Sequence, residues 1–471
     1  MPKDLRTFIR QIQENDPENW IPVEREVDPN LELTGVLRKL QDEGRYPTLL
    51  FQHVRGSELP VLSNALGSRK RLALLFDTTE EGLTDAYVRR QEQLIPPERV
   101  ETGPVKEVVE TGERADVTKL PQIIHCGEDA GPYISSGVVI AKDPDTGLYN
   151  AGIYRIQKVG PRKLRIYPGE YSHLWHLHRK QEERNLPLDV AIVIGHYPTL
   201  YMASQYRGPL DTDEIEVAGG LAQEPIRMTP SETLDLDVPA DAEIVIEGRI
   251  LPHIREEEGP FGEFTWYLGP SEMNPVIEVT AVTRRRDAIY QDVFNAHPEH
   301  NLIGLVGREA GVYAKVKATI PTVKAVSIPF SACCRHAAYI SIKKEIDGAG
   351  RNCALTALGA DPFIKLVIVV DDDVNVFNEA EVMWAVATRV RADEDVIIIP
   401  ESNVCQLDPS AYDITSRNKR GGLNAKWFID ATKPVGLPFQ QRASVPEEIW
   451  KNIDLDAYLK PVSTGASRKA V

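Results

Sequence analysis

The segment between residues 135 and 292 constrains the fold most, because it contains a succession of short stretches rich in β-branched residues. Turn sequences such as Asp143-Pro-Asp-Thr-Gly147 separate these stretches, and two helical segments, at about Leu174–Glu183 and Thr212–Ala222, interrupt them. Many short strands with turn chemistry between them predict a barrel or a sandwich. The expected strands are Ser135–Lys142, Asn150–Lys158, Lys163–Tyr167, Val190–Ile194, Glu243–Leu251, Val276–Thr283 and Ala288–Asp292.

The segments on either side of this region alternate helical and strand-like patterns and predict α/β domains. On the N-terminal side, Leu33–Glu43 is typical of a helix and Pro47–His53 of a strand. On the C-terminal side, a helix is expected over Glu299–Lys317, and the continuous apolar run Lys365–Val370 predicts a central buried strand. We therefore expect three domains, residues 1–110, 111–315 and 316–471, the last ending in a terminal helix near 446–459.

The charge and the apolar pattern exclude several classes of protein. A net charge of −16 over 471 residues argues against non-specific binding to nucleic acid or to an anionic membrane, because a polyanion would be repelled. No run of 18 apolar residues is present, so no membrane span is expected. The N-terminus is an amphipathic helix pattern without the features of a signal peptide, and the five cysteines have no CxxC spacing. These features predict a cytoplasmic protein with reduced thiols.

The stretch Glu258-Gly-Pro-Phe-Gly-Glu263 is the main candidate for chemistry. Its two carboxylates are five residues apart, a spacing that places them on one face of neither a helix nor a strand. Gly and Pro between them demand a turn, and a bent loop brings the carboxylates together. Paired carboxylates in unlike environments are a common basis of acid/base catalysis. The alternative interpretation is an acidic surface turn.

Three further polar positions have both a functional and a structural interpretation. In Asn150-Ala-Gly-Ile-Tyr-Arg155, a bulge at Gly152 could re-aim one polar end, or the segment is a plain strand with a solvated arginine. His173 begins a helical segment and is either a ligand or a capping residue. Glu214 lies at an expected helix N-terminus, where acidic residues are favoured by the helix dipole alone.

The segment Asn295-Ala-His-Pro-Glu-His300 places two imidazoles and a carboxylate directly before an apolar helix. It is a candidate wall of a substrate pocket, and equally a helix cap. The chain contains no GxGxxG after a strand, no GxxxxGK[ST] and no GxSxG, so the common nucleotide-binding and hydrolase signatures are absent.

Taken together, these pieces resemble the UbiD family of reversible decarboxylases, which use prenylated flavin mononucleotide (FMN). The resemblance runs over nearly the whole chain, and its strength lies in the number and order of the matching pieces. They are DLRTFIRQIQ, GPYISSGVVIAKDPDTGLYNAGIYR, VPADAEIVIEG, EEEGPFGE, RRRDAIYQ, IVVDDDVNVFN, VMWAVATR and GGLNAKWFIDATKP.

The resemblance implies an α+β fold in which a central split β-barrel, of the flavin-reductase kind, is flanked by the two α/β domains. It implies that prenylated FMN is held through a divalent metal, usually Mn²⁺, with K⁺ nearby. The implied metal ligands are Asn150, His173 and Glu214. Oxygen and imidazole ligands of this kind suit a hard cation bound to a phosphate. The implied cofactor contacts are Gly152, Ile153, Tyr154, Arg155, Ser172, His173 and Lys426.

The implied activity is reversible, non-oxidative decarboxylation of an aromatic, heteroaromatic or α,β-unsaturated acid through a covalent adduct with prenylated FMN. The family's catalytic trio matches Arg155, Glu258 and Glu263. Arg155 would orient the substrate carboxylate and keep Glu258 ionised, whereas Glu263 would deliver a proton. Two alternatives are a flavin-dependent redox enzyme on the same barrel and a non-catalytic, ligand-binding family member.

The substrate region departs from the family members that act on polyprenyl hydroxybenzoate, because NAHPEH replaces a GRPPDE-like stretch. We expect His297, His300 and Ile303 to line the substrate pocket, and Arg335 and His336 to lie within reach of it. Polar side chains here favour a small polar or heteroaromatic acid over a polyprenylated one. The resemblance also implies a flavin prenyltransferase as supplier of the cofactor, and a homodimer or higher homo-oligomer.

Overall fold

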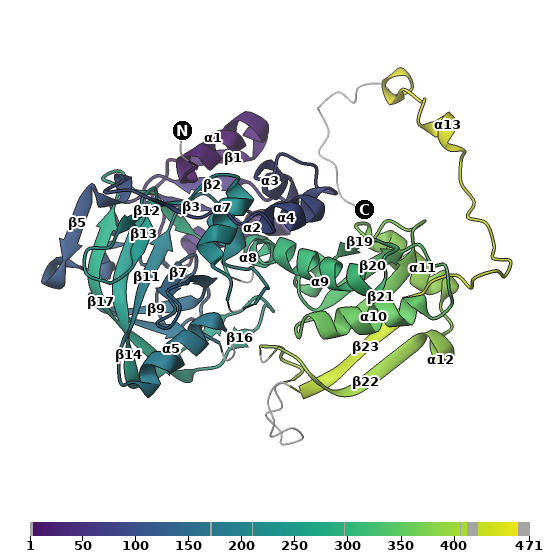
Figure 1. Cartoon of the computed structure of the whole chain (residues 1–471). Coiled ribbons are helices and arrows are strands. Elements are labelled where there is room, and N and C mark those ends of the chain that lie inside the picture. The colour runs from purple at the N-terminus through teal and green to yellow at the C-terminus, as the bar shows by residue number, and fades with distance from the viewer. Residues whose placement is uncertain are drawn as a thin grey trace. The chain divides into compact units, whose positions relative to one another are not determined.

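An antiparallel sheet of nine strands curls into a half-barrel and carries most of the candidate residues (Figure 1). The computed structural model describes residues 3–169, 172–209, 211–295, 297–405, 407–411 and 423–459. The strands of the curled sheet are β5 (Val108–Thr111), β6 (Tyr133–Ile134), β7 (Val138–Lys142), β8 (Tyr149–Ile153), β9 (Arg155–Gly160), β10 (Lys163–Tyr167), β11 (Leu188–Ile194), β14 (Ile244–Glu258) and β17 (Glu272–Arg284). Of the two alternatives expected from the short strands, the structure has the barrel-like one.

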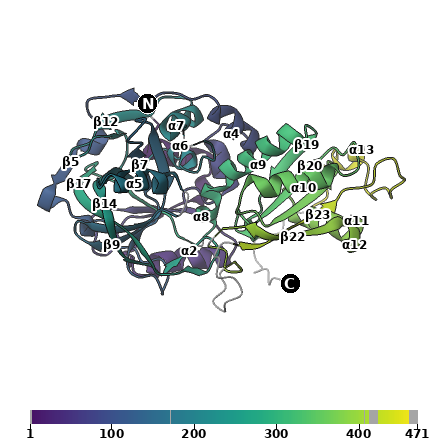
Figure 2. The same cartoon turned by 60° about the horizontal axis from the view of Figure 1, so that its bottom comes forward.

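Both faces of the curled sheet are apolar, so each must be covered. Along β11, Val190 and Ile192 belong to one buried cluster, whereas Ala191 and Val193 between them belong to a second. Alternate residues of a strand point to opposite faces, so a continuous apolar run requires a packed layer on both sides. Helix α5 (His173–Glu183) packs against β7, β8, β11 and β14 (Figure 2). Helices α6 (Thr199–Ala203) and α7 (Glu214–Ala222) pack against β8.

A four-stranded sheet in the order β1-β2-β3-β18 forms from the N-terminal part of the chain and one later strand. Apolar side chains at positions 5, 8, 9 and 12 lie on one side of the first helix and are buried, as the amphipathic pattern indicates. The elements here are α1 (Leu5–Asn15), β1 (Trp20–Val23), α2 (Glu32–Asp42), β2 (Thr48–Phe51), β3 (Val61–Ser63), α3 (Arg69–Leu74), α4 (Leu83–Gln91) and β18 (Tyr290–Asp292). Short strands elsewhere are β4 (Glu98–Arg99), β12 (Arg227–Pro230), β13 (Asp237–Pro239), β15 (Phe261–Gly262) and β16 (Leu268–Gly269).

A five-stranded sheet in the order β19-β20-β21-β23-β22 follows the half-barrel, with helices on both faces (Figure 1). Its central strand β21 is the buried apolar run that the sequence predicts. The helix expected over Glu299–Lys317 is wrong as one element, because Gly304 divides it into two helices. The elements are α8 (Pro298–Ile303), α9 (Leu305–Thr319), β19 (Val323–Ser327), β20 (Ala337–Ile342), α10 (Ala349–Ala360), β21 (Leu366–Asp371), α11 (Glu379–Arg389), α12 (Ala392–Asp395), β22 (Val396–Asn403) and β23 (Leu423–Ala431).

Residues 1–432 and residues 433–471 form two compact units, and each is described by itself. The described part of the second unit contains a four-residue helix, α13 (Glu447–Trp450), and a short 3₁₀ turn at Leu455–Ala457. One continuous terminal helix near 446–459 was expected, and that expectation is wrong. Helices this short are marginal without a packed apolar face, and Ile449, Trp450 and Leu455 are exposed.

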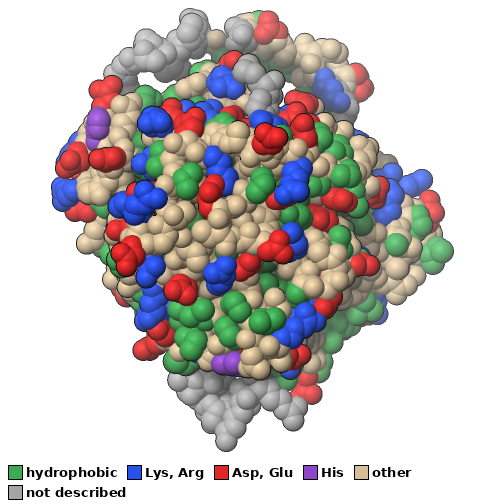
Figure 3. Space-filling model, turned by 60° about the vertical axis from the view of Figure 1, so that its left-hand side comes forward, with side chains coloured by type: hydrophobic (Ala, Val, Ile, Leu, Met, Phe, Trp, Pro, Cys, Tyr) green, Lys and Arg blue, Asp and Glu red, His purple; other side chains and the backbone are tan. Residues whose placement is uncertain are grey.

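Acidic and basic side chains alternate over the face of the molecule shown in Figure 3. A surface of mixed sign does not form the continuous basic field that nucleic acid requires. Within the described ranges, no helix has the length and apolar character needed to cross a membrane.

Two glycine-to-alanine substitutions should have opposite effects on stability. At Gly248 in β14, an added Cβ would lie 2.7 Å from the carbonyl oxygen of Glu278 and 2.7 Å from a methyl of Ile277. We expect Gly248→Ala to lower the free energy of unfolding by about 1–3 kcal/mol through overpacking. At Gly35 in helix α2 an added Cβ meets no atom within 4 Å. Gly35→Ala should therefore raise the free energy of unfolding by about 0.5–1 kcal/mol. Urea denaturation of both variants measures the difference, and equal effects would contradict the packing described for β14.

Candidate active site

The two glutamates of the EGPFGE stretch lie on opposite sides of a sharp reversal of the chain. Glu258 is the last residue of β14, and Glu263 directly follows the short strand β15. Between them the Gly259–Pro260 peptide bond is cis, and Gly259 has a φ of +96°. This left-handed conformation suits glycine alone, since an added Cβ would lie 2.7 Å from the carbonyl oxygen of Pro270. The loop is therefore bent as the sequence predicts, and the surface-turn alternative is wrong because both carboxylates are buried.

Arg155, the first residue of β9, joins the two carboxylates. Its Nη2 and Nε lie 2.8 and 3.1 Å from Oε2 of Glu258, and its Nη1 lies 2.6 Å from Oε1 of Glu263. The guanidinium also lies over the Tyr167 ring, 4.5 Å from its centroid. Only 8% of Arg155 is exposed, so this is a buried ion pair with two partners. Although burial opposes the charge, the two carboxylates raise the pKa of Arg155.

Two further side chains fix Glu258. The hydroxyl of Tyr133 donates to Oε1 at 2.9 Å, and Nδ2 of Asn274 donates to Oε2 at 2.9 Å. The sequence did not predict these partners, because they come from β6 and β17 and reach Glu258 only through the pairing of strands distant in the chain. Together with Arg155 they occupy both carboxylate oxygens. Glu258 is therefore held in one orientation, with donors on both of its carboxylate oxygens.

Glu263 is in a different environment from Glu258. Among the side chains of the described residues, only Arg155 is paired with the carboxylate of Glu263. Burial raises the pKa of Glu263 above its usual value, against the opposite effect of Arg155, and the charge of Glu258 raises it further. A carboxyl group whose pKa is raised keeps its proton to a higher pH than an ordinary glutamate and is a better general acid. The two carboxylates thus differ as an acid/base pair requires.

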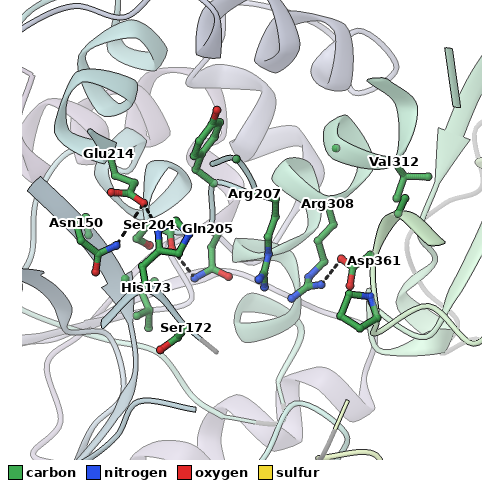
Figure 4. Close-up of a pocket in the computed structure, with 18 of the residues that line it drawn as sticks. Asn150, Ser172, His173, Ser204, Gln205, Arg207, Glu214, Arg308, Val312 and Asp361 are labelled. Atoms are coloured by element: carbon green, nitrogen blue, oxygen red, sulfur yellow. Dashed lines mark hydrogen bonds and ion pairs between the residues drawn. The ribbon is translucent and has the colours of Figure 1, made fainter. Parts of the chain in front are cut away.

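Asn150, His173 and Glu214 lie together at the edge of the half-barrel (Figure 4). Oε1 of Glu214 lies 2.9 Å from Nδ1 of His173 and 3.3 Å from Nδ2 of Asn150. Oδ1 of Asn150 is buried and has no hydrogen-bond partner, although buried polar atoms are normally paired. Burial raises the pKa of Glu214, against the hydrogen bond from His173. An unpaired amide oxygen, a carboxylate and an imidazole fit a divalent metal. Within the described residues, no cluster of three or more His, Cys, Asp and Glu side chains forms a metal site.

A cavity of about 360 Å³ extends from these three residues toward helix α9 and the end of α10. Its walls contain three cations, Arg207, Arg308 and Lys315, and Figure 4 shows both arginines pointing into the same space. Arg308 donates to Asp361 at 2.5 Å, whereas Arg207 has no ion pair with a described residue. The charge of Arg308, followed by burial, lowers the pKa of Arg207 to about 10. The cavity therefore offers positive charge to an anion such as a phosphate.

The other residues predicted to contact a cofactor divide into two groups. Gly152, Ile153, Tyr154 and Ser172 line the cavity, together with His173. Arg155 and Lys426 are not among its lining residues. The ammonium of Lys426 donates to the carbonyl oxygens of Leu358 and Asp361, at 2.9 and 3.3 Å, near the C-terminal end of α10. This lysine neutralises the unpaired carbonyls of a helix end. Arg207 and Arg308 were not predicted, since no local pattern marks either arginine.

His297, His300 and Ile303, the predicted substrate-pocket residues, lie on or beside the short helix α8. None of the three lines the cavity described above. The Nδ1 atoms of both imidazoles are buried without a hydrogen-bond partner. His297 stacks on Phe294, with ring centroids 5.4 Å apart. Burial, followed by the charge of Arg335, lowers the pKa of His300 to about 3, so this imidazole is neutral.

Comparisons with known proteins match the chain over most of its length. Models of the 3-octaprenyl-4-hydroxybenzoate carboxy-lyase (UbiD) N-terminal, Rift-related and C-terminal domains match residues 17–91, 98–298 and 301–431. The anhydromevalonate phosphate decarboxylase of Methanothermobacter thermautotrophicus is 36% identical over 433 residues, which are 92% of this chain and 97% of that protein. A second protein of this name, from Methanosarcina mazei, is 34% identical, and the match covers 94% of this chain and 99% of that protein.

A solved structure agrees with this match. The UbiD-class enzyme HmfF from Pelotomaculum thermopropionicum, in complex with FMN, superposes with a TM-score of 0.90 at 39% identity. The superposition covers 97% of this chain and 100% of that one.

Replacement of His297 should change how stability depends on pH. Burial, followed by the charge of Arg38, lowers the pKa of His297 from 6.5 to about 3. As the pH falls below 6.5, the unfolded chain binds a proton at this residue that the folded chain does not, so stability is lost on acidification. Between pH 7 and pH 5 this linkage costs about 2 kcal/mol, and His297→Gln should remove that part of the loss. Urea denaturation at the two pH values measures it, with His53→Gln, at an exposed histidine, as the control that should behave as the wild type.

Proposed function

The chain belongs to the UbiD family of decarboxylases, and on this premise we propose that it removes CO₂ reversibly from an α,β-unsaturated, aromatic or heteroaromatic acid. The observation that carries the proposal is the buried arginine Arg155, which contacts a fixed glutamate, Glu258, and a glutamate of raised pKa, Glu263. A broken set would favour the non-catalytic alternative, whereas all three side chains are present and in contact.

Prenylated FMN is the proposed cofactor, and when bound it supplies an electron sink for the loss of CO₂. Asn150, His173 and Glu214 would hold a divalent metal such as Mn²⁺ against its phosphate, with K⁺ nearby, and Arg207 would add positive charge to that end of the cavity. We propose that the curled sheet is a split β-barrel of the flavin-reductase kind. Relatives of known structure are in complex with FMN and, in an evolved dimeric form of HmfF, with prenylated FMN.

The residues of the trio have separate roles in the proposed reaction. Arg155 orients the carboxylate that is lost, because its guanidinium is a planar donor fixed by Glu258. Tyr133 and Asn274 hold Glu258 in place and thereby hold Arg155. Glu263 delivers a proton to the substrate carbon after CO₂ leaves, and removes it in the carboxylating direction. Its raised pKa suits a group that both gives and takes a proton.

The proposal extends to the substrate and the assembly. The relatives from both organisms are named for a phosphorylated acid, which supports a substrate that carries an anionic group besides its carboxylate. The neutral imidazoles of His297 and His300 remain proposed pocket residues. A homodimer or higher homo-oligomer in the cytoplasm, supplied by a flavin prenyltransferase, completes the proposal.

The acid assignment is tested by Glu263→Gln in protein co-expressed with a flavin prenyltransferase. The variant should retain cofactor and lose at least about 100-fold in CO₂ release and in exchange of the substrate proton, since general acid catalysis contributes about 10²–10⁴. Glu257→Gln, which alters an exposed neighbouring carboxylate, is the control and should match the wild type. Full activity in Glu263→Gln would refute the role. Plain FMN at stoichiometric occupancy in active protein would instead favour the redox alternative.

The proposed metal site makes a separate prediction. Glu214→Gln should lose bound Mn²⁺ and flavin together, because the carboxylate is the one anionic ligand of the set. Glu216→Gln, two residues further along the same helix α7, should retain both the metal and the flavin. Metal analysis by mass spectrometry and flavin content by absorbance measure the two. Retention of flavin after loss of the metal would show that the metal does not hold the cofactor.

A further inference from the structure

Arg335 is a buried guanidinium with unused donors. Only 6% of the residue is exposed, and its guanidinium lies over the Phe264 ring, 4.5 Å from the centroid. Its Nη1 donates to Oδ1 of Asn301 at 3.2 Å and to the carbonyl oxygen of Cys333 at 3.4 Å. Nε and Nη2 have no acceptor among the described residues, and no described carboxylate forms an ion pair with Arg335. Arginine presents five donors in a rigid fork, so much of its capacity remains available.

The surroundings of Arg335 carry excess positive charge. Burial, followed by the charges of Arg308 and Arg207, lowers the pKa of Arg335 to about 9, which still leaves it charged at neutral pH. The nearby carboxylate Asp361 is paired with Arg308. A buried charge without a partner is costly. A protein that retains such a charge beside a reaction site has a use for it, and a bound anion would offset the cost.

Arg335 has neighbours that belong to the loop of the trio and to the wall of the cavity. Phe264, on which it stacks, directly follows Glu263, and the charge of Arg335 contributes to the electrostatic environment of Glu263. On the other side, a Cβ added to Gly304 would lie 3.0 Å from Nη2 of Arg335 and 3.2 Å from Oε1 of Gln205, a residue that lines the cavity. The absent side chain at Gly304 therefore leaves space for the guanidinium at this point.

We propose that Arg335 binds a second anionic group of the substrate, so that the acid accepted by this site is a dianion. The inference rests on the proposed function and names its substrate class: one carboxylate is lost at Arg155, and a second carboxylate or a phosphoryl group is retained at Arg335. Arg155 cannot serve the second group, because the proposed reaction already assigns it to the carboxylate that is lost. Arg207 and Lys315 stand in the wall of the cavity where the cofactor phosphate is proposed, and Arg308 is paired with Asp361. Arg335 is left for the substrate.

Three acids of similar length test the proposal: sorbate, a monoanion; trans,trans-muconate, with a second carboxylate; and 4-phosphonocrotonate, with a phosphoryl group. The wild-type holoenzyme should prefer at least one dianion over sorbate in kcat/KM. Arg335→Gln should lower kcat/KM for that dianion by about 10- to 100-fold, mainly through KM, because a charge-assisted hydrogen bond is lost. The loss of kcat/KM for sorbate should be at least threefold smaller than the loss for that dianion. The acid that responds more strongly identifies the second group as carboxylate or phosphoryl.

Two further variants separate recognition from folding. Arg335→Lys should recover part of the preference, since the charge remains without the fork. Gly304→Ala should weaken dianion binding without removing any charge, because the new Cβ displaces Nη2. Thermal unfolding of each variant reports the fold. Equal losses for sorbate and for the dianions in Arg335→Gln, or no dianion preference in the wild type, would overturn the inference.

Calorimetric titration of the cofactor-free protein with the same three acids distinguishes this inference from the proposed reaction. Binding of a dianion that Arg335→Gln abolishes, in a protein that decarboxylates none of the acids after reconstitution, would support the anion site and refute the decarboxylase assignment. Decarboxylation of sorbate and of a dianion at rates that Arg335→Gln leaves unaltered would support the reaction and refute the anion site.

Discussion

The ion pair of Arg155 with Glu258 and Glu263 is the interaction on which the rest of the site depends. One guanidinium fixes two carboxylates from opposite sides of a reversed loop, and it is buried with them. A buried pair of this kind contributes little net stability compared with apolar packing, but removing one partner leaves a costly unpaired charge. The network therefore holds the loop in one conformation more than it stabilises the fold. Its value lies in placing a protonatable carboxyl group beside a fixed cation.

The surroundings of Arg155 differ from those of Arg207 and Arg335 in how the buried charge is balanced. Around Arg155 the charges are nearly balanced within the protein, and Tyr133 and Asn274 supply the remaining hydrogen bonds of Glu258. Around Arg207 and Arg335 the protein leaves positive charge without an ion-pair partner among the described residues. The charge of Arg308, followed by burial, lowers the pKa of Arg207, whereas burial, followed by the charge of Arg308, lowers the pKa of Arg335. A balanced network is suited to moving a proton, and an unbalanced one to holding an anion.

Local sequence predicted those features of the site that are themselves local. The spacing of Glu258 and Glu263 around Gly and Pro required a bend, and the bend is present. Local sequence did not predict the partner of that bend, because Arg155 is about a hundred positions away. It was assigned through family resemblance alone. Tyr133 and Asn274 were missed, since they meet Glu258 only through strand register across the sheet. Register is set by which apolar face each strand buries, and that depends on strands that are distant in the chain.

The break at Gly304 shows how one residue links fold and specificity. The apolar periodicity on both sides predicted a single helix, and the periodicity is real, since α8 and α9 are both helical and largely buried. The pattern could not predict the approach of Arg335, because that residue lies 31 positions later in the chain. Its guanidinium uses the space that a side chain at 304 would fill. A methyl group there would leave the backbone conformation allowed, because the φ of Gly304 is −85°. The requirement for glycine is therefore one of space for a cation, and a substrate with a second anionic group is what makes that cation useful.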